Sequence, residues 1–130
     1  MDNRFIDRAL FENRATRKYF VGTFPADRLP KCTKFPCSLI VNLDPSGMPG
    51  THWCAIWARS PGVAYFFDSY GEMPNDLIKK YLANNFRKIY FNRKKFQSIF
   101  SNVCGHYVLV FIYFMSLGFD FEFIMQFLKR

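Results

Sequence analysis

Residues 51–68 read THWCAIWARSPGVAYFFD, and this stretch decides the fold. Two runs rich in aromatic and branched side chains, 51–58 and 63–68, flank the turn signal Arg59-Ser60-Pro61-Gly62. Runs of this composition with Pro and Gly between them are typical of a β-hairpin. We therefore expect an antiparallel pair of strands near the middle of the chain.

The predicted hairpin also brings His52 close to Asp68. If the turn is centred on Ser60, the two residues stand eight positions to either side of it and lie directly opposite each other. Cross-strand Cβ atoms are about 4.5–5.5 Å apart, so Asp68 can hold one imidazole nitrogen and leave the other as a base. A four-residue loop would instead pair Trp53 with Asp68 and turn His52 to the other face, unless a bulge corrects the register.

The elements on either side of the hairpin mix helices and strands. We expect a helix around 5–11, an irregular connection at 22–34, a buried strand at 37–43 that stops at the turn 44–47, a helix from about 75 to 84, a strand at 87–91, and helices at 104–118 and 120–129. This order predicts an α+β fold, a small mostly antiparallel sheet packed with helices, in one domain spanning 1–130.

Composition narrows the functional classes. Half of the 130 residues are hydrophobic and 20% are aromatic, which predicts a packed core rather than disorder. The formal net charge of +8 is compatible with contact to nucleic acid, although basic residues spread this widely along a chain are more often a solvated face. The most apolar run, 107–115, is far shorter than the ~20 residues that span a bilayer, so we expect no membrane contact.

Four cysteines, Cys32, Cys37, Cys54 and Cys104, occur without a secretory signal at the start of the chain. This combination predicts an intracellular protein with reduced thiols rather than a disulfide framework.

Cys104 stands at the predicted start of an apolar helix, ahead of Gly105. The partial positive charge and N–H groups of a helix N-terminus favour a thiolate and can face an oxyanion. Gln97, seven residues earlier, can add another donor with its amide. Taken singly, each residue has an ordinary structural explanation: a buried cysteine, a satisfied histidine, an aspartate that ends a strand. Together they predict a cysteine nucleophile with a histidine base.

A zinc site is the alternative reading of some of the same residues. His52 with Cys54 and Cys104 with His106 supply two imidazoles and two thiols. The ligands within each pair are separated by one residue, not the two to four usual for structural zinc, and on a helix Cys104 and His106 would diverge by about 200°. We therefore expect no metal and no organic cofactor.

Five stretches resemble the adenain family of adenovirus-type proteases and its relatives in virus-like transposons of the Maverick/Polinton kind. They are Tyr19–Thr23, Ser38–Asn42, Gly50–Trp53, Tyr65–Gly71 and Gln97–Gly105. The likeness extends over roughly residues 19–117. It relates the chain to the clan of the SUMO- and ubiquitin-like proteases.

The resemblance implies a cysteine endopeptidase. His52 would be the general base, Asp68 its partner and Cys104 the nucleophile. Gln97 and the backbone N–H of Cys104 would line the oxyanion hole, and Trp53 would flank a narrow substrate cleft. The implied substrates are viral or virus-like precursor polyproteins cleaved at Gly-Gly or Gly-X sites. For an intracellular protein of this kind, the nucleus and the virion are the locations that the resemblance suggests.

Two departures qualify the resemblance. Cys104 follows Asp68 by only 36 positions, fewer than in adenain, so we expect a trimmed fold. No cysteine lies between them, which argues against the disulfide-linked activating peptide of adenain. Activation by a non-covalent peptide or by DNA bound to the basic surface stays open by analogy.

Two other functions remain open at this point. One is an isopeptidase for SUMO- or ubiquitin-like modifiers, against which the small size argues. The other is a non-catalytic, basic nucleic-acid-binding domain. We expect a monomer in each case, with a precursor protein as the partner of the endopeptidase.

Overall fold

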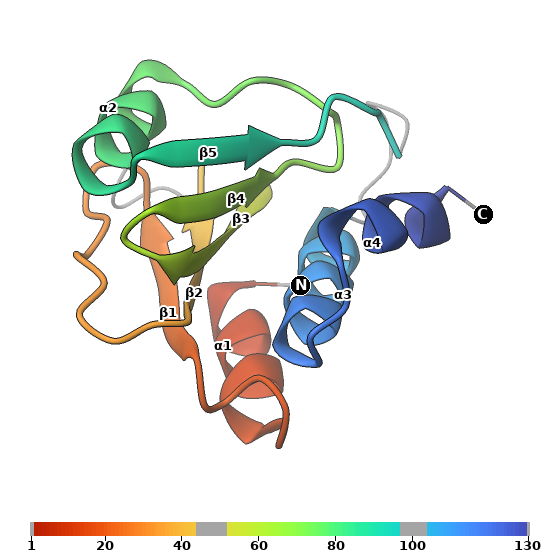
Figure 1. Cartoon of the computed structure of the whole chain (residues 1–130). Coiled ribbons are helices and arrows are strands. Elements are labelled where there is room, and N and C mark those ends of the chain that lie inside the picture. Colours follow the sequence, from red (N-terminus) through yellow and green to blue (C-terminus); the bar gives the residue numbers. More distant parts are fainter. Residues whose placement is uncertain (1, 44–51, 97–103, 130) are drawn as a thin grey trace.

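The computed structural model describes residues 2–43, 52–96 and 104–129 (Figure 1). Its elements in chain order are α1 (Asn3–Glu12), β1 (Phe20–Pro25), β2 (Cys37–Asn42), β3 (Trp53–Ser60), β4 (Val63–Phe67), α2 (Asp76–Asn85), β5 (Lys88–Phe91), α3 (Cys104–Ser116) and α4 (Phe121–Leu128). The predicted α+β class is confirmed, as are the hairpin and the helix that begins at Cys104.

The strands lie in the order β1-β2-β3-β4-β5 in one sheet. The central pairings, β2 with β3 and β3 with β4, are antiparallel, and the two outer pairings are parallel. β5 is parallel to β4 because the chain crosses back through α2 between them. All six residues of β2 are buried, as expected for an inner strand that is covered on both faces.

β1 is a strand that the sequence did not predict, since residues 22–34 were expected to be an irregular connection. Gly22 has φ +136°, and the register with β2 shifts between Phe20 and Thr23, so the strand carries a bulge. Pro25 is tolerated because the strand lies at the edge of the sheet. The glycine and proline that suggested a loop are therefore the features of a bulged edge strand.

Each face of the sheet has its own core. α1, α3 and α4 cover one face, where Trp53, Trp57 and Phe67 pack against Phe111. The opposite face carries α2, whose Ile78 and Leu82 pack with residues such as Cys54 and Phe66. Figure 1 shows α2 separated from the other three helices by the sheet. Alternation along a strand therefore decides which of the two cores a side chain joins.

Helix ends follow the sequence signals. The side chain of Asp2 accepts a hydrogen bond from Phe5 N at the start of α1, and Asn75 caps α2. Beyond α3, Gly118 has φ +91° and donates its N–H to Met115 O. The left-handed conformation at the end of α3 explains the glycine at this position.

The expectation of reduced thiols is wrong for two of the four cysteines. Cys32 and Cys37 form a disulfide that closes the connection leading into β2. Cys54 is buried in the core beneath α2. None of the helices in the described ranges is both long and apolar enough to cross a membrane.

Candidate active site

His52 and Asp68 meet at one end of the sheet, just before β3 begins and just after β4 ends. His52 Nε2 lies 2.8 Å from Asp68 Oδ1. Asp68 is 3% exposed and the His52 side chain 14% exposed. The predicted contact between the two residues is thus present, and it is shielded from water on most sides.

The register that produces this contact differs from the predicted one. Ala55 pairs with Phe67 and Trp57 with Tyr65, which, continued outward, places Cys54 rather than His52 opposite Asp68. The register shifts between Ala58 and Ser60, and this irregularity puts the even-numbered residues of both strands on one face. His52 therefore reaches Asp68 diagonally, across a two-residue offset.

Continued outward past the ends of β3 and β4, this register places Tyr70 opposite His52. Its ring stacks on the imidazole, with centroids 4.5 Å apart and an interplanar angle of 18°. The imidazole is consequently held at its edge by Asp68 and on one face by Tyr70. Sequence reasoning did not single out this role of Tyr70, because it depends on the observed register.

The Asp68 carboxylate is oriented by the backbone that follows it. Tyr70 N donates to Oδ1 at 3.1 Å and Glu72 N donates to Oδ2 at 3.2 Å. Gly71 makes this turn possible, since it has φ +69° and a Cβ there would lie 2.8 Å from Arg93 O. The aromatic-glycine pair after Asp68 is therefore needed both for the turn and for close packing against the loop after β5.

Asn92, just past β5, brackets the peptide backbone of Asp68. Its Oδ1 accepts from Asp68 N at 2.8 Å, and its Nδ2 donates to Asp68 O at 2.6 Å and to Lys94 O at 3.1 Å. Asn92 is 4% exposed, and both of its bonds to Asp68 are buried. Sequence reasoning missed this residue, because an asparagine after a strand is an ordinary turn signal.

Two further hydrogen bonds join the Asp68 loop to the first turn of α3. Ser69 O accepts from Phe96 N at 2.8 Å, and Phe96 O accepts from Tyr107 OH at 2.8 Å. α3 begins at Cys104, three residues before Tyr107. The loop after Asp68 is therefore joined, through Phe96, to the first turn of α3.

Aromatic packing also joins β4 to α3. Phe67, directly before Asp68, stacks on Phe111 of α3 with centroids 4.7 Å apart. Gln97 lies outside the described residues, as does the side chain of Cys104. Their roles stay predictions.

Trp53 points to the opposite face from the His52–Asp68 pair. It is 4% exposed, and its indole Nε1 donates to Asn3 Oδ1 at 2.7 Å. The predicted role of Trp53 beside a substrate cleft is not tested by this contact. His106, a member of the alternative zinc set, is exposed on α3.

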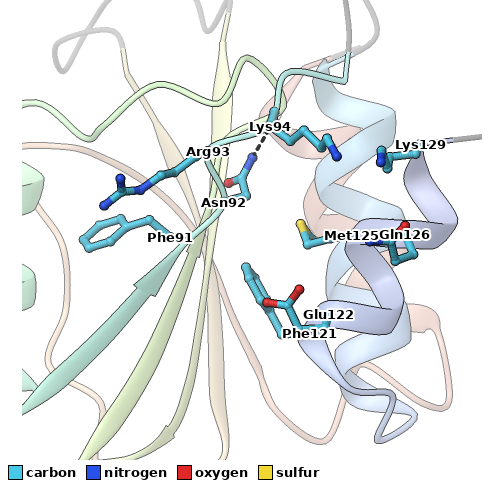
Figure 2. Close-up of a pocket in the computed structure, with 9 residues that line it drawn as sticks. All are labelled: Phe91, Asn92, Arg93, Lys94, Phe121, Glu122, Met125, Gln126 and Lys129. Atoms are coloured by element: carbon cyan, nitrogen blue, oxygen red, sulfur yellow. Dashed lines mark hydrogen bonds between the residues drawn. The ribbon is translucent and has the colours of Figure 1, made fainter.

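A cavity of about 390 Å³ adjoins the far side of Asn92. It is lined by Phe91, Asn92, Arg93, Lys94, Phe121, Glu122, Met125, Gln126 and Lys129. Figure 2 shows the ammonium groups of Lys94 and Lys129 pointing toward each other from the loop after β5 and from the end of α4. The proximity of Lys129 lowers the pKa of Lys94 below its ordinary value.

The sheet and helices together have the fold of a protease. One solved structure with this fold is the ASFV pS273R protease, which aligns with a TM-score of 0.67 and 17% identity over 95% of this chain and 60% of that one. A second, of Se-Met ASFV pS273R protease, aligns with a TM-score of 0.47 and 22% identity over 69% of this chain and 39% of that one. This chain thus spans 60% of the length of the first protease.

No model of a known protein family matches the sequence, and no curated protein matches it. The protease fold is shown by the structural likeness. The narrower resemblance to adenain stays a prediction.

Proposed function

We propose that the protein is a cysteine endopeptidase with Cys104 as nucleophile, His52 as base and Asp68 as the acid that orients it. The observation that carries this proposal is the His52–Asp68 contact of 2.8 Å, next to a loop that is hydrogen-bonded through Phe96 to the first turn of α3. An imidazole held by a buried carboxylate next to a helix that starts with cysteine is the arrangement that acyl transfer by a thiolate needs. The protease fold supports the same class of reaction.

The contact also supports an assignment of roles to the two ring nitrogens. Since Nε2 of His52 faces Asp68, the nitrogen that accepts the Cys104 proton is Nδ1. The thiolate attacks the peptide carbonyl carbon, and Gln97 with the backbone N–H of Cys104 holds the oxyanion. The imidazolium gives its proton to the departing amine, and the imidazole then takes a proton from the water that hydrolyses the thioester. No net charge is left on the enzyme.

The proposed substrate is a precursor polyprotein of viral or virus-like origin, cut at a Gly-Gly or Gly-X bond. This part follows from the resemblance of the sequence to adenain and its relatives. The alternative substrate is a SUMO- or ubiquitin-like conjugate. Comparing kcat/KM for a Gly-Gly peptide with kcat/KM for a modifier conjugate decides between them, and a preference for the conjugate would overturn the precursor assignment.

The decisive experiment is labelling with a thiol-reactive peptide that ends in glycine, followed by mapping of the modified residue. We expect modification of Cys104, and loss of it in His52→Ala. His106→Ala is the matched control, because this exposed histidine lies on the same helix two residues from Cys104. Labelling of Cys54 instead, or labelling of Cys104 that survives His52→Ala, would contradict the mechanism.

The proposed oxyanion hole has its own test. Gln97→Ala should lower kcat by roughly 10²–10³ while the peptide still labels Cys104 slowly, as for other single oxyanion-hole donors. A kcat within a few-fold of the original would remove Gln97 from the mechanism.

Nucleic-acid binding is the second candidate function, favoured by the converging ammonium groups of Lys94 and Lys129. Neither ammonium group forms a salt bridge with Glu122 within the described residues. The two like charges repel each other, and a bound phosphate would relieve this repulsion. Affinity for single-stranded DNA should fall in a Lys94→Gln/Lys129→Gln variant more than in Lys79→Gln/Lys80→Gln on α2. Equal losses of DNA affinity in the two double variants would indicate non-specific electrostatic attraction. If the original protein cleaves no peptide and the Cys104→Ala variant still binds DNA, nucleic-acid binding would be favoured over the peptidase.

A further inference from the structure

Three potential metal ligands lie close together on the face of the sheet that the even-numbered residues of β3 and β4 share. A ring nitrogen of His52, the sulfur of Cys54 and a carboxylate oxygen of Asp68 all lie within 4.8 Å of one another. Cys54 is 1% exposed and Asp68 3% exposed, so the thiol and the carboxylate are inside the protein. The proposed peptidase mechanism uses His52 and Asp68 but has no role for Cys54.

The donor set indicates a particular class of cation. Calcium and magnesium take oxygen ligands, whereas one nitrogen, one sulfur and one oxygen suit Zn²⁺. Three protein ligands with a fourth position left for water or another group is a common zinc arrangement. The sequence-based alternative also named His52 and Cys54, but in the described residues their third neighbour is Asp68 and not His106.

The distances are close to those that zinc requires. Bonds of about 2.0–2.3 Å in a tetrahedron hold the ligand atoms about 3.3–3.6 Å apart. His52 Nε2 and Asp68 Oδ1, now 2.8 Å apart, must separate by about half an ångström. The widest separation in the cluster, at most 4.8 Å, must close by about 1 Å. Both changes are of the size that rotation of side chains can supply.

We propose that His52, Cys54 and Asp68 form an inhibitory Zn²⁺ site. When the ion binds, the Cys54 thiol releases its proton to solvent. If Nε2 of His52 carries the ring proton, that proton is relocated to Nδ1 through solvent, so the imidazole binds the ion as the neutral ring and no oxidation state changes. The ion enters past His52, the most exposed ligand of the three. The inhibition rests on the proposed peptidase function, because zinc occupies the imidazole that would act as base. Binding of the ion rests on the cluster alone.

Cobalt absorption tests the binding without any need for activity. The full chain carrying Cys104→Ala is titrated with Co²⁺, whose bond to a thiolate gives a near-ultraviolet charge-transfer band. We expect one equivalent to bind and Zn²⁺ to displace it. The band should vanish when Cys54→Ala is added and persist when Cys32→Ser and Cys37→Ser are added instead. A band that outlasts the loss of Cys54, or no stoichiometric band at all, overturns the site.

Inhibition of the otherwise unaltered enzyme tests the consequence. Cys54→Ala should leave metal-free kcat/KM within a few-fold and raise the Zn²⁺ concentration for half inhibition at least tenfold. If the Cys54→Ala variant unfolds, Cys54→Val is used instead, because valine is similar in size to cysteine. If both variants unfold, the cobalt titration is repeated with His52→Ala, which removes a different ligand of the site. Equal zinc sensitivity with and without Cys54 contradicts the proposal. A chain that binds cobalt through Cys54 but cleaves no peptide keeps the metal site and refutes only the peptidase.

Discussion

His52 and Trp53 are neighbours in the sequence, yet they join two buried polar networks of different character. His52 contacts Asp68, which Asn92 brackets through two further hydrogen bonds. Trp53, on the opposite face, donates to Asn3 at the start of α1. The first network contains two groups that gain and lose protons, and the second contains only neutral donors and acceptors. The difference predicts that damage to the first reduces catalysis, whereas damage to the second reduces stability.

The sharpest test of this difference is Asp68→Asn. A neutral amide cannot stabilise the imidazolium, and it can donate to Nε2 and hold the wrong tautomer of His52. We expect kcat/KM on a Gly-Gly peptide to fall by roughly 10³–10⁴, by analogy with other triads, in a protein that still unfolds cooperatively. Asp76→Asn, in the first turn of α2, is the control and should retain full activity. Retention of more than a tenth of the activity by Asp68→Asn would show that the network has no catalytic role.

Asn92→Ala tests whether the bracket around Asp68 matters. Loss of the amide leaves the N–H and C=O of Asp68 without their buried partners, at a cost of about 1–3 kcal/mol each, and lets the carboxylate shift. Because a displacement of about 1 Å can cost 10²-fold in rate, we expect kcat to fall about 10- to 100-fold at temperatures where the variant is folded.

The control for this prediction is Asn85→Ala, which removes a side-chain bond to Tyr81 O on α2. It should reduce the free energy of unfolding and leave kcat unchanged. If Asn92→Ala lowers the stability to urea but not kcat, then Asn92 has only a structural role, as we expect for Asn3. The first network would then contain a structural residue as well as catalytic ones.

The two networks also differ in how far the sequence reveals them. The His52–Asp68 pair follows from a short hairpin, where the two partners are 16 residues apart and alternation limits the possible registers. Asn92 contacts Asp68 across 24 residues, and only the parallel pairing of β5 with β4 brings them together. Parallel pairing depends on where α2 packs, which no local pattern in the sequence encodes.

The start of α3 at Cys104 was predictable for a different reason. A break in the apolar pattern followed by thirteen helical residues is a local signal, and Gly118 marks the other end. The exact register of the hairpin was not predictable, because the turn residues 59–62 do not by themselves show that the register shifts between Ala58 and Ser60. The His52–Asp68 contact forms in spite of this error, because the observed register differs from the predicted one by two residues. A shift of two residues leaves each side chain on the same face of the sheet.

Tyr70 offers a smaller test within the first network. Its stacking on His52 is worth about 0.5–1.5 kcal/mol if it resembles other aromatic pairs. We expect Tyr70→Leu to lower kcat by about 2- to 10-fold and Tyr70→Phe, which keeps the ring, to restore the rate. Equal rates for the leucine and phenylalanine variants would mean that Asp68 alone holds the imidazole in place.

Asn3→Ala should have the smallest effect on catalysis. It leaves the indole N–H of Trp53 buried without its acceptor, which costs about 1–3 kcal/mol and lowers the melting temperature by several degrees. Asn3→Asp keeps an acceptor at the same place and should recover most of this loss. We expect kcat of the folded Asn3→Ala protein to stay within about twofold, since the damage lies on the α1 face of β3 and His52 lies on the other. A tenfold loss of kcat, measured where circular dichroism shows full folding, would mean that Trp53 transmits its position to His52 through the first residues of β3, and the two networks would then act as one.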